Sequence, residues 1–337
     1  MCKKNVKNTV ILLLALLLCG SVSAKVNNYV GAYATAAEWS LLPSGSKYSG
    51  SLGFAGGIGG LYELQAGPTY SPSRFLFDVG VGAWGGMTSF MQGSDAIVER
   101  LNQHDLQNDL FDYVYEIHGR KDSYNNIAVQ VPLMVGVQHN RFYMLVGAKL
   151  NASFWTKTKS TATLNTYGRY AEFGEMRNMP EYQFFENEKI KGGVKTSFNL
   201  DVDLSFEIGG RIGVVTDAVG FDVPQRKIEY RLAAFVDYGL FDLHNQGTKD
   251  ALVTPSYYDI NPSSKDYVYK GRSMVDNIVM NDIMSTSGFA KAVNNLTVGL
   301  KFTVLFQLQE EGKCVLCRDA YGSSVRRGRR GGVQYEE

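Results

Sequence analysis

Acidic residues alternate with apolar ones along several stretches of this sequence, and they have the clearest capacity for chemistry. In the segment FNLDVDLSFEIG, Asp201, Asp203 and Glu207 recur at even spacings. Two carboxylates held close together could act as a general acid and a general base. The same spacing arises in a strand with one polar face, because every second residue points to the same side. We interpret these carboxylates as structural and predict no catalytic residue.

The charged residues that share this polar face form one set. Continued along the other alternating segments, the register places ten charged side chains in a common interior: Glu63, Asp78, Lys149, Asp201, Asp203, Glu207, Glu229, Arg231, Asp237 and Lys301. Charges in such a place are stable only if they are paired or hydrated. We therefore expect a network of ion pairs. The excess of carboxylates could also attract the C-terminal arginines Arg326, Arg327, Arg329 and Arg330.

Other residue types give little support for catalysis or cofactor binding. The four histidines lie in expected loops or turns, with no HExxH or GxSxG motif beside them. Cys314 and Cys317 are too few for a zinc site and predict at most a local disulfide. The run GGIGG at Gly56–Gly60 opens no helix, so it predicts a small-residue strand rather than a phosphate loop. We expect no cofactor and no metal.

The N-terminus has the features of a secretory signal. Lys3, Lys4 and Lys7 precede the apolar run Val10–Cys19, and Val22-Ser23-Ala24 offers a small-residue cleavage site. We predict a signal peptide at 1–24, an outer-membrane domain at 25–309 and a periplasmic tail at 310–337. A membrane anchor and a lipoprotein acylated at Cys19 are the alternatives. Without the three lysines the chain is slightly acidic, so nucleic acid is not an expected partner.

The elements that must position the interior charges are long alternating strands. Asn295–Leu308 places an apolar residue at every second position, with Leu305 the exception. Soluble strands usually have about five or six residues, whereas a strand tilted across a bilayer needs roughly 9–11. Seven further segments repeat the pattern: Asn28–Trp39, Leu52–Leu64, Arg74–Trp84, Ala128–Gln138, Phe142–Phe154, Phe198–Gly209 and Ile228–Leu240. They predict an all-β fold, an eight-stranded antiparallel transmembrane β-barrel with long extracellular loops.

The links between these segments are alternately short and long after the first pair. Short periplasmic turns and long external loops are typical of outer-membrane barrels, so both termini are expected in the periplasm. Apolar residues at helical spacing predict short helices in the long links, between Ser94 and Tyr115 and after Ser273. Strict alternation turns Trp84 and Trp155 inward, so either a bulge intervenes or these residues cap the interior.

Particular segments resemble a known family. Long glycine-rich strands after a signal sequence, VQVPLMVGV at Val129–Val137 and GLKFTVLF at Gly299–Phe306 are similar to the outer-membrane β-barrel family widespread in Bacteroidetes. That family is related in form to PorT-like and OmpA-like eight-stranded barrels. The resemblance covers Tyr29–Leu308. It implies a location in the bacterial outer membrane, in contact with membrane lipid and lipopolysaccharide.

The expected function is structural rather than enzymatic. We predict an accessory component of a larger outer-membrane assembly that binds outer-membrane or surface proteins through its extracellular loops. An eight-stranded interior is just wide enough for side chains to fill it. Two alternatives of other classes stay open. Some barrels of this size are lipid-modifying enzymes, and a hydrated interior would make a small porin-like channel.

Overall fold

The computed structural model describes most of the chain between residues 24 and 308. The described residues are 24–44, 48–68, 72–104, 109–179, 184–193, 195–196, 199–216, 222–224, 228–243, 251–259, 273–281, 284, 286 and 290–308. The predicted signal peptide up to residue 23 and the predicted tail lie outside them. So do Cys314, Cys317 and the four C-terminal arginines, whose predicted roles therefore stay predictions.

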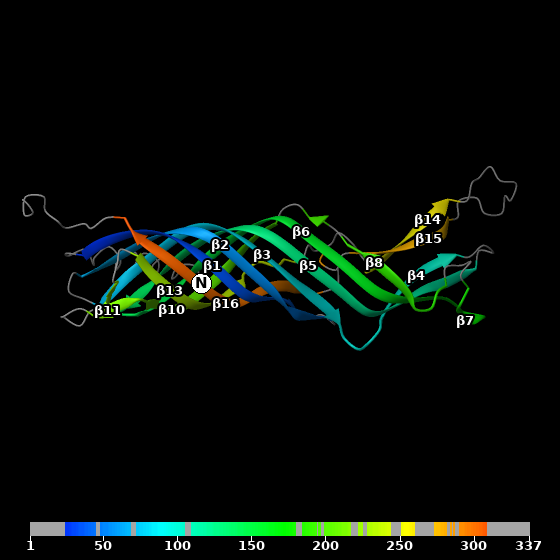
Figure 1. The fold of residues 1–337 in the computed structure, drawn as a ribbon. Helices are drawn as coiled ribbons and strands as arrows, with labels where there is room; N and C mark the ends of the chain where they lie inside the picture. The colour runs from blue at the N-terminus through cyan, green and yellow to red at the C-terminus, as the bar shows by residue number, and fades with distance from the viewer. Residues whose placement is uncertain are drawn as a thin grey trace, which may run out of the picture.

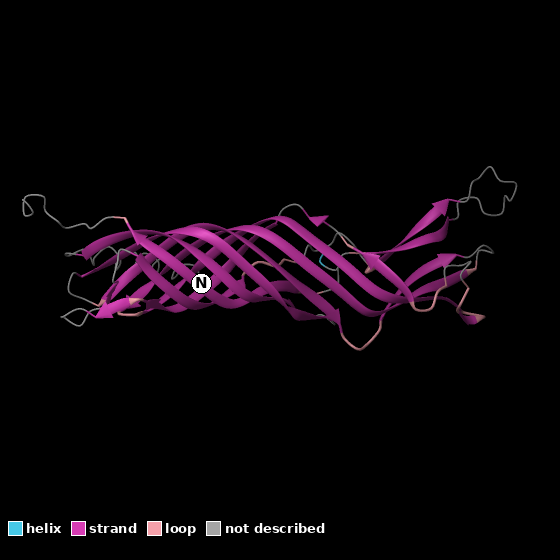
Figure 2. Cartoon of the chain, in the orientation of Figure 1, coloured by secondary structure: helices cyan, strands magenta, loops and turns pink. Residues whose placement is uncertain are grey.

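Eight long strands form a closed ring (Figures 1 and 2). In chain order they are β1 (Ala24–Ser44), β2 (Tyr48–Pro68), β3 (Ser73–Gln92), β5 (Leu110–His139), β6 (Phe142–Tyr170), β10 (Asn199–Ile212), β13 (Ile228–Gly239) and β16 (Ala292–Gln307). Each strand pairs antiparallel with the one that follows it in this order, so that β6 lies between β5 and β10. The last strand, β16, pairs with the first, β1, and this contact closes the ring. Five of the predicted alternating segments fall within these strands, and Leu240 and Leu308 lie one residue past the ends of β13 and β16. Phe198, the first residue of the remaining segment, lies outside the described residues.

The predicted fold class is nevertheless wrong. Among the described residues, the sheet contains fourteen strands rather than eight, because parts of the chain expected to be long loops form further strands. These are β4 (Ile97–His104), β7 (Gly174–Met176), β8 (Glu188–Gly192), β9 (Lys195–Thr196), β14 (Val253–Asp259) and β15 (Ser273–Met280). The sheet is also not wholly antiparallel, since β15 pairs parallel with β8 at Met280 and Gly192. The short strands β11 (Val214–Thr216) and β12 (Asp222–Pro224) form a separate sheet.

The two helices expected in the loops are wrong as well. The first region contains β4, which pairs with the start of β5 from Ile97 opposite Ile117 to His104 opposite Leu110. The second region forms β15, paired with β14. In both places a neighbouring strand offers a ladder of backbone hydrogen bonds, and this tertiary pairing outweighs local helical spacing. No described helix has the length and hydropathy needed to cross a bilayer.

Strands β5 and β6, of 30 and 29 residues, run past the ring at one end. Their outer parts, residues 110–127 and 155–170, are termed the extension together with β4, β7, β8, β14 and β15 (Figure 1). Inward-facing residues of the extension join the ring's rim in one hydrophobic core, which includes Trp39, Phe90, Tyr113, Tyr115, Ile117, Tyr124, Leu164, Leu252 and Val293.

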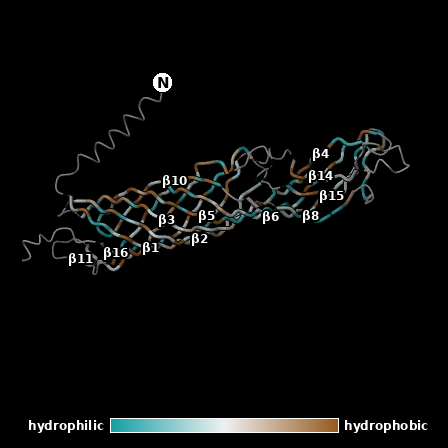
Figure 3. The backbone as a smooth tube through the Cα atoms, turned by 90° about the horizontal axis from the view of Figure 1, so that it is seen from above, coloured by the Kyte–Doolittle hydropathy of each residue, from teal (hydrophilic) through white to brown (hydrophobic). Residues whose placement is uncertain are grey.

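Buried and exposed residues alternate along the ring strands, so side chains point in turn to the interior and to the outer face. Hydrophilic and hydrophobic residues are interspersed along the same strands (Figure 3). The outer face is apolar and exposed, for example at Val146 (47%) and Leu204 (52%). Glycines make room for aromatic rings inside. A Cβ built on Gly59 would lie 2.6 Å from the ring of Tyr33, and one on Gly82 would lie 2.4 Å from its hydroxyl oxygen. Tyr33 therefore fills the interior where the wall has no side chains.

The outward face of β6 changes from apolar to polar at a bulge. On the ring side of the bulge, which is called below it, the outward residues of β6 are apolar and end at Phe154. Phe154 and Trp155 are both exposed, and the register against β5 shifts at Ile127 and Ala128. On the extension side, which is called above the bulge, the outward residues of β6 are polar, beginning with Lys157. Because a bulge adds one residue to one strand, Trp155 points outward although strict alternation turns it inward.

Candidate functional site

The polar interior of the ring is the candidate functional site. The structure brings together all ten charged residues that the sequence placed on the interior face, and each is at most 7% exposed: Glu63, Asp78, Lys149, Asp201, Asp203, Glu207, Glu229, Arg231, Asp237 and Lys301. They come from β2, β3, β6, β10, β13 and β16. The interior is thus a buried electrostatic network shared by most of the ring.

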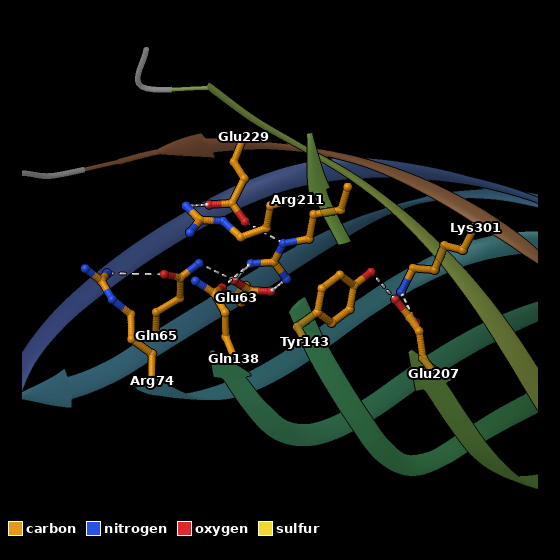
Figure 4. Close-up of polar contacts among 10 residues, drawn as sticks. Glu63, Gln65, Arg74, Gln138, Tyr143, Glu207, Arg211, Glu229 and Lys301 are labelled. Carbon is orange, nitrogen blue, oxygen red and sulfur yellow. Dashed lines mark hydrogen bonds and ion pairs between the residues drawn. The ribbon is translucent and has the colours of Figure 1, made fainter. Parts of the chain in front are cut away.

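Arg231 is the centre of the first cluster. Its partners Glu63 and Glu229 are labelled in Figure 4. Its Nη1 and Nη2 atoms donate to the two oxygens of Glu63 at 2.5 and 2.7 Å, and its Nε donates to Glu229 at 2.6 Å. Arg211 Nη2 donates to the other oxygen of Glu229 at 2.8 Å. The Arg231 guanidinium also lies 4.7 Å from the ring centroid of Tyr143. A planar fork suits such a two-pronged carboxylate contact.

Two further ion pairs lie next to this cluster. Lys301 Nζ lies 2.8 Å from Glu207, whose other oxygen accepts the hydroxyl of Tyr143 at 2.7 Å. Lys149 Nζ lies 2.7 Å from Asp237, which also accepts the hydroxyl of Ser205 at 2.6 Å. Each charge of these two pairs lies within hydrogen-bonding distance of an opposite charge. This is the condition under which buried ion pairs are tolerated.

Amides, rather than cations, contact two other carboxylates. Asn295 Nδ2 donates to Asp201 at 2.5 Å and to Asp203 at 3.1 Å, and Asn151 Nδ2 donates to Asp203 at 2.6 Å. They line a cavity of about 20 Å³, which has room for one water molecule. Asp78 faces Glu63 across the β2–β3 pair. In the described part of the chain, no three His, Cys, Asp or Glu residues lie together as metal ligands would.

Aromatic residues close the interior toward the extension. The rings of Trp39 and Trp84 meet edge to face at 5.0 Å, and Tyr124 lies 5.7 Å from Trp39. Trp39 is 1% exposed. Trp84 therefore points inward and caps the polar interior, whereas Trp155 faces outward after the bulge. Strict alternation left two explanations for these residues, a bulge or a cap on the interior. The cap applies to Trp84 and the bulge to Trp155.

The sequence reasoning missed two buried arginines. Arg211 continues the face of Asp203 and Glu207 on β10, but the predicted strand stopped at Gly209, before reaching it. Arg120 pairs with Asp122 inside the extension, with Nε 2.8 Å from the carboxylate, and donates to the carbonyl of Asn281 at 2.6 Å. The alternation of Arg120, Asp122 and Tyr124 was a usable signal, but these residues were assigned to a loop.

The chain matches no protein-family model and no curated protein sequence. The resemblance to the Bacteroidetes outer-membrane family therefore stays a prediction. Function must be inferred from the geometry of the ring and the extension. The ion pairs of the interior join residues on different strands, so they link strands of the ring to one another.

Proposed function

We propose that this chain is an outer-membrane protein whose ring spans the bilayer and whose extension projects from it, with a structural or accessory role in a larger assembly. The abrupt end of the apolar outer face at Phe154 and Trp155 carries this proposal. From Phe142 to Phe154, at about 3.3 Å per residue and a tilt of about 45°, that face is about 28 Å tall. The apolar band of outer-membrane proteins is about 25 Å tall.

Exposed apolar residues around the ring support a lipid environment. They occur on widely separated strands, with Ile58 68% exposed on β2, Phe142 72% on β6, Leu200 55% on β10 and Leu300 57% on β16. A soluble monomer rarely exposes apolar patches beyond a few hundred Å². With charges inside and apolar groups outside, the ring has the polarity expected of a protein dissolved in lipid.

The buried state of the interior favours a structural role over a channel. Glu63 is 0% exposed and Arg231 is 2% exposed, so water does not reach the centre of the first cluster. A conducting pore would leave such groups in contact with solvent. At the end of the interior next to the extension, the packed rings of Trp39 and Trp84 also obstruct a path for ions.

The positions of the strand ends support an orientation. Tyr29 near the start of β1 pairs with Gln307 at the end of β16, at the same end of the ring as the tight turn between β5 and β6. If the N-terminal signal directs export, this end faces the periplasm and the extension faces outward. There, β4 and β14 form the two ends of the described sheet. Strand edges can pair with an extended segment of another protein, which suits an accessory role.

Cysteine labelling in native outer membranes tests the membrane position. Val146→Cys lies in the middle of the proposed lipid face, and Thr163→Cys lies outward on the same strand above the bulge. We expect a water-soluble maleimide to modify position 163 and not position 146, read at each site by mass spectrometry. Rapid modification of both positions would contradict the proposal.

Planar-bilayer recording of the purified full chain tests the closed interior. We expect no discrete conductance steps for the wild type. Reproducible steps that change size in Arg231→Ala would instead establish a channel through the polar interior.

A further inference from the structure

A cluster of lysines lies on the outer face of the extension. On β6, outward-facing Thr161 pairs with Lys121 of β5 on one side and with Lys191 of β8 on the other. Lys159 lies one outward position away on the same strand. Neighbouring strands are about 4.8 Å apart, so Lys121 and Lys191 are about 10 Å apart across Thr161. Three ammonium groups can thus converge above one threonine.

These three lysines are exposed, and none forms an ion pair with a described residue. Two further lysines on the same face flank them, Lys157 on β6 and Lys189 on β8. The nearest outward carboxylate along this part of β5 is Glu116, beyond the cluster and engaged with Arg177. Several uncompensated cations on one small surface favour an anionic ligand.

The position of the cluster, in the extension beyond the apolar outer face of the ring, indicates the class of ligand. On β6, Phe154 and Trp155 end the apolar outer face, and Lys157 and Lys159 follow on the same strand. Lys121 and Lys191 lie on the neighbouring strands β5 and β8, beside Thr161. In a bilayer, the phosphate groups of lipids lie immediately outside the hydrocarbon. Basic residues at this level attract anionic headgroups.

We propose that Lys121, Lys159 and Lys191 form a binding site for a phosphate group of an outer-leaflet glycolipid, with Thr161 at its centre. The inference rests on the proposed membrane position for the lipid source of the phosphate. The phosphate accepts hydrogen bonds from the three ammonium groups, while the acyl chains lie against the apolar face below. Each lysine near an anionic lipid surface contributes about a fivefold change in affinity, so the three contribute about a hundredfold.

Binding of phosphorylated lipid A to the full chain in detergent micelles tests the site. The probe is compared with enzymatically dephosphorylated lipid A and with inorganic phosphate, using native mass spectrometry and competition. The test variant is K121Q/K159Q/K191Q. The matched control, R100Q/R169Q/K291Q, removes the same charge from exposed positions elsewhere.

We expect phosphorylated lipid A to bind the wild type and the control alike, and the test variant about a hundredfold more weakly. Equal binding by the test variant, or equal losses in both variants, would overturn the site. Equal binding of dephosphorylated lipid A would overturn recognition of the phosphate. Displacement by inorganic phosphate at matched concentration would overturn the lipid as its source. Because binding is measured in detergent, its result is separate from the labelling test of the membrane position.

Discussion

Arg231 and Glu63 are 168 positions apart in the sequence, yet the ring joins them through two N–O contacts of 2.5 and 2.7 Å. Both side chains are almost completely buried. The contact links β13 to β2, which are not neighbours in the sheet. It therefore joins two strands that are separated by β16 and β1, through the interior and independently of the backbone hydrogen bonds.

Replacing Arg231 with methionine should strongly destabilise the ring. The change leaves Glu63 without its cation in a buried site, and breaking a buried pair from one side costs about 3–5 kcal/mol. The free energy of unfolding in lipid vesicles measures the effect. Adding Glu63→Gln should recover part of the loss, because Arg211 still pairs with Glu229. A double variant as unstable as Arg231→Met would mean that the charge left on Glu63 is not the cause.

An arginine in the proposed lipid face should be far more costly than one above the bulge. Val146→Arg places a charge in the middle of the apolar outer face, where the cost is about 2–4 kcal/mol. Thr163→Arg occupies an outward position in the extension and should be nearly neutral. Urea unfolding in vesicles compares the two. Equal losses would show that the bulge does not mark the edge of the bilayer.

The three tryptophans should report different surroundings. Trp155 is 38% exposed on the outer face, whereas Trp39 and Trp84 pack together inside. Brominated lipids should therefore quench wild-type fluorescence in part, and Trp155→Phe should abolish that quenching. Trp84→Phe serves as the control and should retain it. Quenching that survives Trp155→Phe would place another indole against lipid.

The contact between β4 and β14 should weaken as pH rises. Glu99 accepts the backbone N–H groups of Leu252, at 2.8 Å, and Val253, at 3.4 Å. Burial raises the pKa of the Glu99 carboxyl above its usual 4.5, although these N–H groups oppose the shift. Because the folded state favours the protonated form, its contribution is complete below the unfolded pKa and is lost as pH rises through the folded pKa.

Hydrogen exchange at Leu252 and Val253, corrected for intrinsic rates, measures this dependence. Protection should fall as pH increases above 4.5 in the wild type. Glu99→Gln should show constant protection over the same range, since an amide does not titrate. Protection that instead rises with pH would show that the charged carboxylate is the better partner.

Local periodicity was enough to locate the ring strands and the interior charges. The period of two is visible within each segment, so Asp203 and Glu207 could be placed on one face without knowing their neighbours. Arg211 was missed because Gly209 and Gly210 interrupt the apolar pattern just before it. The face of Trp155 depends on the bulge opposite Ile127, and alternation alone could not locate that bulge.

The extension could not be derived from local patterns. Its strands exist because β5 and β6 continue beyond the ring and expose edges to which β4, before them in the chain, and β8, after them, can pair. The parallel contact between Gly192 and Met280 joins segments far apart in the chain. Local spacing in the same regions favoured helices or loops. A prediction of eight strands was therefore wrong where stability depends on distant partners.

The continuity of β5 and β6 has a mechanical consequence. Each of these strands passes from the ring into the extension without a linker, and their mutual pairing resumes directly after the shift at Ile127. A force on the outer tip would load their hydrogen bonds along the strand direction, in shear, instead of bending a flexible joint. We expect the extension to be rigid relative to the ring, so that a force applied to its tip is transmitted to the ring strands.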